Sequence, residues 1–158
     1  MRTGWMIAIL DSGCNRTCHG DRWMQRYMKA TNQDISDYPV RQETCSIRGI
    51  SGNVSTQGIR RLEVCFELKD AHGSFAVGTL DSTELSNSDA PLLLSIRDQR
   101  RLQLQLDLTG DTSTVYSKLF GGHIKVTEVN GLLGLHLLPS QVALLACLLY
   151  TSPSPRDA

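Results

Sequence analysis

The most informative stretch of the sequence runs from Trp5 to Gly20 and reads WMIAILDSGCNRTCHG. Its apolar run, Met6 to Leu10, ends abruptly in Asp11-Ser12-Gly13. A short apolar run closed by a glycine-containing turn is typical of a buried β-strand. Such a strand carries one carboxylate at its tip, and because desolvating a charge costs free energy, we expect that carboxylate to have a partner or a chemical task. The alternative is an ordinary Asp-Ser-Gly turn, which the tripeptide alone favours.

The residues around the tripeptide resemble a known family. The apolar strand, Asp-Ser-Gly, a small residue (Cys14) and a threonine shortly after it (Thr17) resemble the active-site loop of retropepsin-type aspartic proteases. More closely, ILDSGCNRTCHGDRW is similar to the protease segment of Pol polyproteins from copia-like retrotransposons. The later signature of that family is an apolar strand, a short helix and a further strand, matched here by Ala90 to Asp98 and Leu102 to Leu108. One departure is Ser95, where the family usually has glycine.

The resemblance implies a mostly-β fold, a retropepsin-like closed β barrel with one or two short helices. We expect the protease core to span residues 1–108, without the further N-terminal strand that such domains usually carry before the catalytic aspartate. A C-terminal β-hairpin extension is expected over residues 109–146. Residues 147–158, CLLYTSPSPRDA, resemble the translation of a sequencing-library adapter. A natural Pro/Ser-rich tail fits their composition equally well.

The resemblance implies catalysis by Asp11, in a loop completed by Ser12 and Gly13. An aspartic protease needs two carboxylates about 3 Å apart that share one proton. One activates water and the other protonates the scissile carbonyl. Because the sequence contains a single Asp-Ser-Gly, the second carboxylate must come from a second copy, and we expect a homodimer. Ser12 would hydrogen-bond across its two-fold axis, and the substrate would be a peptide or polyprotein.

A β-hairpin is predicted over Cys45 to Leu68, with the sequence RGISGN at its tip. The return strand alternates apolar and polar residues up to Leu68. The resemblance makes this hairpin the flap that closes over a substrate, with Gly49, Ile50 and Gly52 as the substrate-binding residues. Glycines are also common at hairpin tips for turn geometry alone.

Hydrophobic periodicity predicts one helix in the first half of the chain, from Asp21 to Ala30. Asp21 can cap it, and one apolar stripe contains Trp23, Met24, Tyr27 and Met28. The stripe is interpreted as core packing. Further predicted elements are a polar connection over 31–40, a strand over 74–80, a polar loop over 81–89, a buried strand over 92–94, a short helix over 96–101 with exposed Arg97, Arg100 and Arg101, a half-buried strand over 102–108, and two hairpins that turn at Gly121-Gly122 and Asn130-Gly131.

Charge and cysteine usage limit the partners. Sixteen basic and sixteen acidic residues are interspersed and cancel, so no basic face of the kind that phosphate binding demands is expected, and nucleic acid is not expected to bind directly. Five irregularly spaced cysteines favour reduced thiols in an intracellular, cytoplasmic protein. The spacing Cys14-x3-Cys18-His19 is compatible with zinc, but no second ligand pair follows, so neither a metal nor a cofactor is expected. No segment is predicted to span a membrane.

Two rival functions stay open. The first is an aspartic endopeptidase that processes a retrotransposon polyprotein. The second is a catalytically inactive retropepsin-like domain that dimerises or binds peptides. A hydrolase built on Cys14 and His19 is a weaker third possibility, because a cysteine beside such a loop is more often a small packed residue.

Overall fold

The described part of the chain, residues 6–42, 56–70 and 74–138 of a computed structural model, is mostly β with two short α-helices. The predicted flap residues Gly49, Ile50 and Gly52 and the terminal segment 147–158 lie outside these residues. The elements are β1 (Ile7–Leu10), β2 (Cys18–Gly20), α1 (Asp21–Ala30), the short 3-10 turn η1 (Ile35–Asp37), β3 (Thr56–Glu67), β4 (Phe75–Leu85), β5 (Leu92–Leu94), α2 (Ile96–Arg101), β6 (Leu104–Asp107), β7 (Thr114–Ser117), β8 (Gly122–Ile124), β9 (Val126–Val129) and β10 (Leu132–His136).

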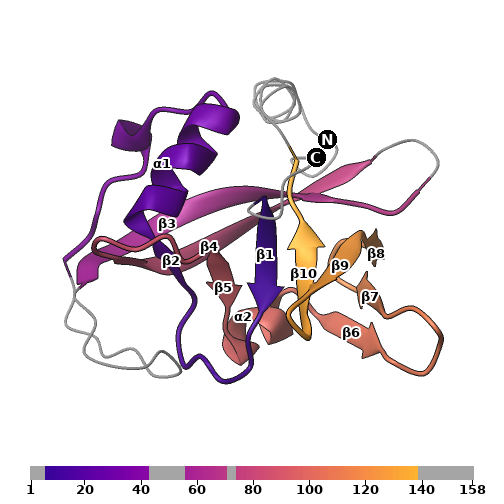
Figure 1. The fold of residues 1–158 in the computed structure, drawn as a ribbon. Coiled ribbons are helices and arrows are strands. Elements are labelled where there is room, and N and C mark those ends of the chain that lie inside the picture. Colours follow the sequence, from indigo (N-terminus) through magenta and orange to yellow (C-terminus); the bar gives the residue numbers. More distant parts are fainter. Residues whose placement is uncertain (1–5, 43–55, 71–73, 139–158) are drawn as a thin grey trace.

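Seven of these strands form one sheet in the order β3-β4-β2-β5-β1-β10-β9 (Figure 1). Strand β5 lies between β1 and β2, which are consecutive in the sequence. It runs parallel to β1, with Leu10 beside Leu94, and antiparallel to β2, with Cys18 beside Leu93. The chain that leaves β1 must therefore loop around the end of β5 before it enters β2. That loop contains the Asp-Ser-Gly tripeptide.

The segment after β6 contributes to both sheets. Strands β6, β7 and β8 form a separate three-stranded sheet, whereas β10 pairs antiparallel with β1, so that Ala8 lies beside Leu135. The turn between β9 and β10 has left-handed backbone at Asn130 (φ 51°) and Gly131 (φ 82°), as a type I′ turn requires. The predicted hairpin at this turn is confirmed.

The predicted closed barrel is not found in the described residues. The outer strands of the large sheet, β3 and β9, do not pair with each other there. The end of β3 instead makes single bridges, from Phe66 to Leu137 and from Leu68 to Ile124. The first bridge joins the ends of β3 and β10 within the large sheet, and the second joins the end of β3 to β8 of the small sheet. Both are isolated contacts and not a continuous ladder.

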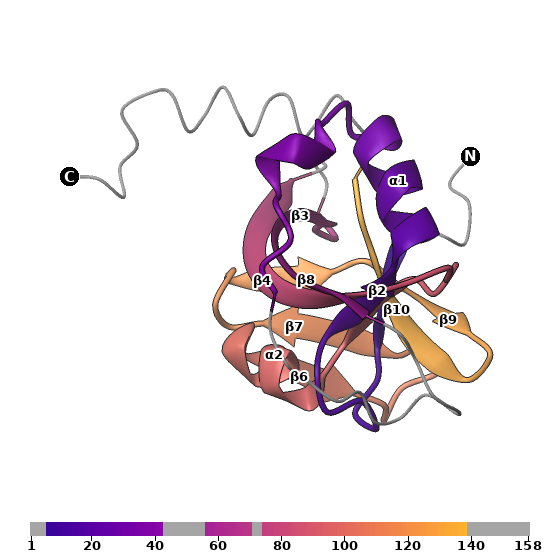
Figure 2. The same ribbon diagram turned by 90° about the vertical axis from the view of Figure 1, so that its left-hand side faces the viewer.

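Helix α1 covers one face of the large sheet, as the side view shows (Figure 2). Its buried stripe is the predicted one, and it packs into the main core together with side chains from the central strands: Trp23, Met24, Tyr27, Met28, Ala8, Leu10, Leu62, Val64, Leu92 and Leu94. The Trp23 and Tyr27 rings stack with centroids 4.9 Å apart. Fully burying large side chains of this kind stabilises a fold by about 1.5–3 kcal/mol each.

The predicted cap of α1 is wrong. Gly20 occupies the N-cap position and contributes no side-chain hydrogen bond. Asp21 is the first helical residue, and its carboxylate accepts hydrogen bonds from the backbone N–H groups of Asn87 and Ser88, at 3.0 and 2.9 Å. Asp21 therefore ties the start of the helix to the loop after β4 instead of closing its own first turn.

Several predicted boundaries also change. Strand β4 runs to Leu85, through a segment predicted to be a loop, because it pairs with β3 along its whole length. On β3 the expected alternation fails near its end, where Cys65 and Glu67 are buried too; Cys65 packs on Leu138, and Glu67 pairs with Lys125 at 2.8 Å. In the predicted strand 102–108, Leu106 and Leu108 are 45% and 65% exposed, so that strand is less buried than expected.

Candidate active site

Asp11 lies at the carboxyl end of β1, where that strand meets β5. Its backbone N–H donates to the carbonyl oxygen of Leu94 at 3.0 Å, which closes the last pair of the parallel ladder, Leu10 beside Leu94. The residue itself is half-buried, whereas Ser12 and Gly13 are exposed. The two segments that carry the family resemblance, about 80 residues apart in the sequence, thus meet at the tripeptide. Its tip faces away from the core.

Gly13 keeps the turn after Asp11 tight. Its backbone N–H donates to Oδ1 of Asp11 at 3.1 Å. A Cβ at this position would lie 3.3 Å from the same oxygen, closer than ordinary van der Waals contact. Gly13 therefore lets the backbone approach the carboxylate, and with a larger residue at this position the Asp11 carboxylate would have to shift by a few tenths of an ångström.

Thr17 ties the far end of the loop to α2. Its hydroxyl lies 3.3 Å from Oγ of Ser95 and donates to the carboxylate of Asp98, while the backbone N–H of Ser95 donates to it at 3.1 Å. All three side chains are buried. Arg101 completes the group, with its guanidinium 3.2 Å from Asp98. Arg101 is thereby linked to the loop through Asp98 and Thr17.

Ser95, the departure from the family pattern, is accommodated at the start of α2. It is the N-cap residue, and its hydroxyl accepts a weak hydrogen bond from the N–H of Asp98 at 3.4 Å. Its side chain fills the space between the loop and the helix. Serine therefore provides a cap and a contact to Thr17 that glycine could not make.

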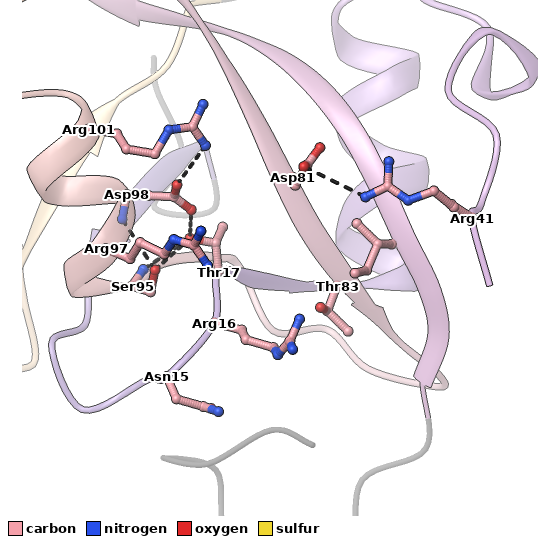
Figure 3. Close-up of a pocket in the computed structure, with 11 residues that line it drawn as sticks. Asn15, Arg16, Thr17, Arg41, Asp81, Thr83, Ser95, Arg97, Asp98 and Arg101 are labelled. Atoms are coloured by element: carbon pink, nitrogen blue, oxygen red, sulfur yellow. Dashed lines mark hydrogen bonds and ion pairs between the residues drawn. The ribbon is translucent and has the colours of Figure 1, made fainter. Parts of the chain in front are cut away.

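A pocket opens beside this loop. It has a volume of about 210 Å³ and lies between the Asp11–Thr17 loop, α2 and the facing parts of β3 and β4 (Figure 3). Its lining is unusually rich in charge, with Arg16, Arg41, Arg97, Arg101, Asp81 and Asp98. This pocket could not be predicted from the sequence. Its lining residues come from segments that are far apart in the chain, and only long-range strand pairing brings β3 and β4 next to the loop.

Cys14 and Cys18 form a buried pair within the loop, with their sulfur atoms 3.8 Å apart. The hydrogen bond from Cys18 lowers the pKa of the Cys14 thiol. The same contact, together with burial, raises the pKa of Cys18. His19 contacts neither sulfur in a hydrogen bond and is directed to other partners, so the hydrolase pair of Cys14 and His19 is not assembled. In the described residues no three His, Cys, Asp or Glu side chains gather as a metal site would require.

A second polar cluster surrounds His19, which is fully buried. Its Nδ1 lies 2.7 Å from Oγ of Ser82, and its Nε2 lies 3.2 Å from Oε1 of Glu84. Glu84 is also held by Arg60 through two hydrogen bonds of 2.8 and 3.0 Å. Ser, His and Glu in contact are the ingredients of a hydrolase triad. However, Ser82 is also fully buried, so no substrate can reach its hydroxyl, and the cluster is structural.

The charges of this cluster are set by burial and hydrogen bonding. Burial lowers the pKa of His19, against the opposing effect of Glu84. Burial also opposes ionisation of Glu84, but the hydrogen bonds from His19 and Arg60 outweigh it and lower the pKa of Glu84 to about 2. We therefore assign a neutral His19 that donates from Nε2 to an ionised Glu84 and accepts at Nδ1 from Ser82. Sequence reasoning missed this cluster, since its members lie on three strands.

No protein-family model, no curated protein and no solved structure matches the chain. None of the helices in residues 6–42, 56–70 and 74–138 is long and apolar enough to cross a membrane.

Proposed function

We propose that the chain is an aspartic endopeptidase of the retropepsin type, active as a homodimer, and that its substrate is a polyprotein of a copia-like retrotransposon. The observation that carries the proposal is the junction of Asp11 with Leu94, at a hydrogen-bond distance of 3.0 Å. The two sequence segments that resemble the family are the two that meet there. A half-buried carboxylate on an exposed turn is also where a second copy could approach.

In the proposed mechanism each protomer supplies Asp11. Two carboxylates held about 3 Å apart cannot both ionise, so they share one proton. The ionised one removes a proton from a water molecule, which attacks the scissile carbonyl carbon, while the protonated one gives its proton to the carbonyl oxygen. When the tetrahedral intermediate collapses, the aspartate that took the water proton gives it to the leaving amine as the C–N bond breaks. The other aspartate takes a proton back from a hydroxyl of the intermediate, so that the carboxyl product forms and the dyad again holds one proton.

Two features of this chain serve that chemistry. The Gly13 N–H that donates to Asp11 fixes one carboxylate oxygen, so that the other is free to face the partner's aspartate. The Thr17 contacts to Ser95 and Asp98 hold the loop against α2, so that its position does not depend on the substrate. Ser12 is exposed beside Asp11, and in the proposed dimer it would contact the second copy.

The first test is cleavage of a peptide with apolar residues on both sides of the scissile bond. Activity should rise with the square of protomer concentration while dimers are scarce, and it should peak at mildly acidic pH, where the dyad holds one proton. Asp11→Asn should abolish cleavage and leave the melting temperature nearly unchanged, since an amide can neither activate water nor share the proton. Asp107→Asn, which changes an exposed carboxylate on β6, is the matched control and should cleave like the parent.

The rival function, an inactive peptide-binding or dimerisation domain, predicts a different pattern. The chain would dimerise and bind the peptide but would cleave nothing at any pH. Cleavage that survives Asp11→Asn would contradict the protease mechanism directly.

A further inference from the structure

The pocket beside the Asp11 loop carries a surplus of positive charge. Two of its four arginines have acidic partners in the pocket: Arg41 lies 3.7 Å from Asp81, and Arg101 lies 3.2 Å from Asp98. The other two are Arg16 and Arg97. No carboxylate in residues 6–42, 56–70 and 74–138 forms an ion pair with either of them, and both side chains are exposed. An anion that enters the pocket would therefore meet two guanidinium groups that are not already neutralised.

These two arginines come from two neighbouring elements, since Thr17 and Asp98, which lie next to them in the sequence, are hydrogen-bonded to each other. Arg16 belongs to the loop itself, five residues after Asp11, and Arg97 belongs to the first turn of α2. Figure 3 shows both side chains reaching toward the middle of the pocket. The pocket is close to the proposed catalytic residue, because Ser95 lines it and the preceding carbonyl, that of Leu94, accepts the Asp11 N–H.

The size and lining of the pocket indicate what kind of anion fits. A volume of about 210 Å³ suits a single side chain and is smaller than the cavities that enclose most small-molecule ligands. A pocket of this size holds one side chain and not a length of phosphate backbone, and the whole chain has no net charge to attract a polyanion. A carboxylate can accept parallel hydrogen bonds from guanidinium groups in a bidentate arrangement. These features favour an acidic peptide side chain over nucleic acid.

We propose that Arg16 and Arg97 select substrates by binding an acidic side chain, Asp or Glu, that lies a few residues from the scissile bond. The inference rests on the proposed function, since the peptide must lie across Asp11 for its side chain to reach this pocket. Apolar contacts at the scissile bond would then be combined with one charged contact further along the peptide.

The experiment measures binding separately from cleavage. The Asp11→Asn chain is titrated into fluorescent peptides that share one apolar scissile pair and carry Glu at one of four positions on either side. Each has a twin with Gln at the same place. At least one Glu peptide should bind about three- to tenfold tighter than its twin, as one or two partly exposed ion pairs predict. The preference should shrink when NaCl is raised from about 0.05 to 0.5 M, because salt screens exposed charges.

Variants then locate the preference. Arg16→Gln and Arg97→Gln in the Asp11→Asn background should each reduce the Glu-over-Gln ratio, and the double variant should bring it close to one. Arg100→Gln is the matched control, because Arg100 is an exposed arginine on the same helix that does not line the pocket; it should keep the full ratio. The double reversal Arg16→Glu with Arg97→Glu should favour a Lys peptide over the Glu peptide.

The outcomes separate this inference from the proposed function. If the parent chain cleaves the Gln peptide and its Glu twin equally well, with equal binding, the selection of acidic residues is wrong and the protease stands. If nothing is cleaved but binding shows the arginine-dependent preference, the inference stands for a peptide-binding domain and the protease fails. A single-stranded oligonucleotide that binds more tightly than the Glu peptide, through the same two arginines, would overturn the inference in favour of a phosphate site.

Discussion

Thr17 is the residue through which the Asp11 loop is fixed to the rest of the molecule. Thr17→Val keeps the shape of the side chain but removes the hydroxyl, which leaves Asp98 and the N–H of Ser95 without their buried partner. A buried polar group that loses its partner costs about 1–3 kcal/mol, so the free energy of unfolding should fall by that amount in urea denaturation. Thr17→Ser keeps the hydroxyl, so its free energy of unfolding should fall by less. A larger loss in Thr17→Ser than in Thr17→Val would show that the methyl group, and not the hydrogen bonds, matters at this position.

Glu84 should be the most sensitive charged residue in the described part of the chain. Glu84→Gln breaks a buried ion pair and leaves the Arg60 guanidinium, which is only 12% exposed, without its charge partner. Breaking such a pair from one side costs about 3–5 kcal/mol. The neighbouring pair between Arg61 and Asp81 joins the same two strands but is exposed, so Arg61→Gln should cost less than about 1 kcal/mol. Similar unfolding free energies for the two variants would contradict the structural role of the His19 cluster.

The same cluster makes stability depend on pH. The pKa of His19 is lowered in the folded chain, so below about pH 6.5 the unfolded chain takes up a proton that the folded chain does not. The contribution of Glu84 is fully present above its ordinary pKa of 4.5 and is lost as the pH falls toward its folded value of about 2. Both effects weaken the fold on acidification. Between pH 7 and 5.5 the unfolding free energy should therefore fall as the unfolded chain protonates this histidine, and His19→Gln should remove that part of the slope.

For individual residues, prediction from the sequence succeeded where burial follows from the pattern of neighbouring residues in the sequence. The apolar run before Asp11 is a strand, and the apolar stripe Trp23, Met24, Tyr27 and Met28 is buried. The partners of Asp21 and His19 could not be predicted, because they come from β4 and the loop after it, more than 60 residues away. A side chain's partner is decided by strand order, and nothing in the local sequence encodes that order.

At the scale of elements, the junction between β2 and α1 has little room. Gly20 is the last residue of β2 and the N-cap of α1, and a Cβ there would lie 2.2 Å from the carbonyl oxygen of Ser88. Because backbone atoms cannot move aside as a flexible side chain can, Gly20→Ala should lower the unfolding free energy by about 1–3 kcal/mol. Gly122→Ala is the matched control, since its Cβ would lie at an ordinary 3.7 Å from Leu68. A thermal melt of Gly20→Ala that coincides with the parent melt would contradict this packing.

The elements also show where periodicity is an incomplete guide. Strand β4 was predicted to end at Leu80 because Asp81, Ser82 and Glu84 are polar, yet it continues to Leu85. Each of these polar side chains has a hydrogen-bond partner on a neighbouring strand. Asp81 pairs with Arg61 of β3, Ser82 with His19 of β2, and Glu84 with Arg60 of β3. Conversely, Leu106 and Leu108 alternate as a buried strand would but are exposed. In both cases tertiary pairing overrides the local pattern.

At the scale of the whole molecule, the fold brings together two segments that are distant in the sequence, β1 with its Asp11 loop and β5 with α2. One copy of the chain supplies only one of the two aspartates that the proposed mechanism needs. The two apolar runs that form β1 and β5 were both predicted as buried strands, but their parallel pairing was not predicted. The insertion of β10 beside β1 could not be predicted, nor could the two sheets that replace a closed barrel in the described residues, because strand order depends on long-range contacts. A single Asp11 per chain still leaves the second carboxylate to another copy.

The most direct test of the proposed dimer mixes parent chain with Asp11→Asn chain at a fixed total concentration, high enough for dimers to dominate, and allows the protomers to exchange. If cleavage needs Asp11 from both copies, only parent–parent pairs are active, and activity should follow the square of the parent fraction. An equal mixture should then retain about one quarter of the parent activity. A value near one half, proportional to the parent fraction, would show that each copy cleaves by itself and would contradict the shared pair of aspartates.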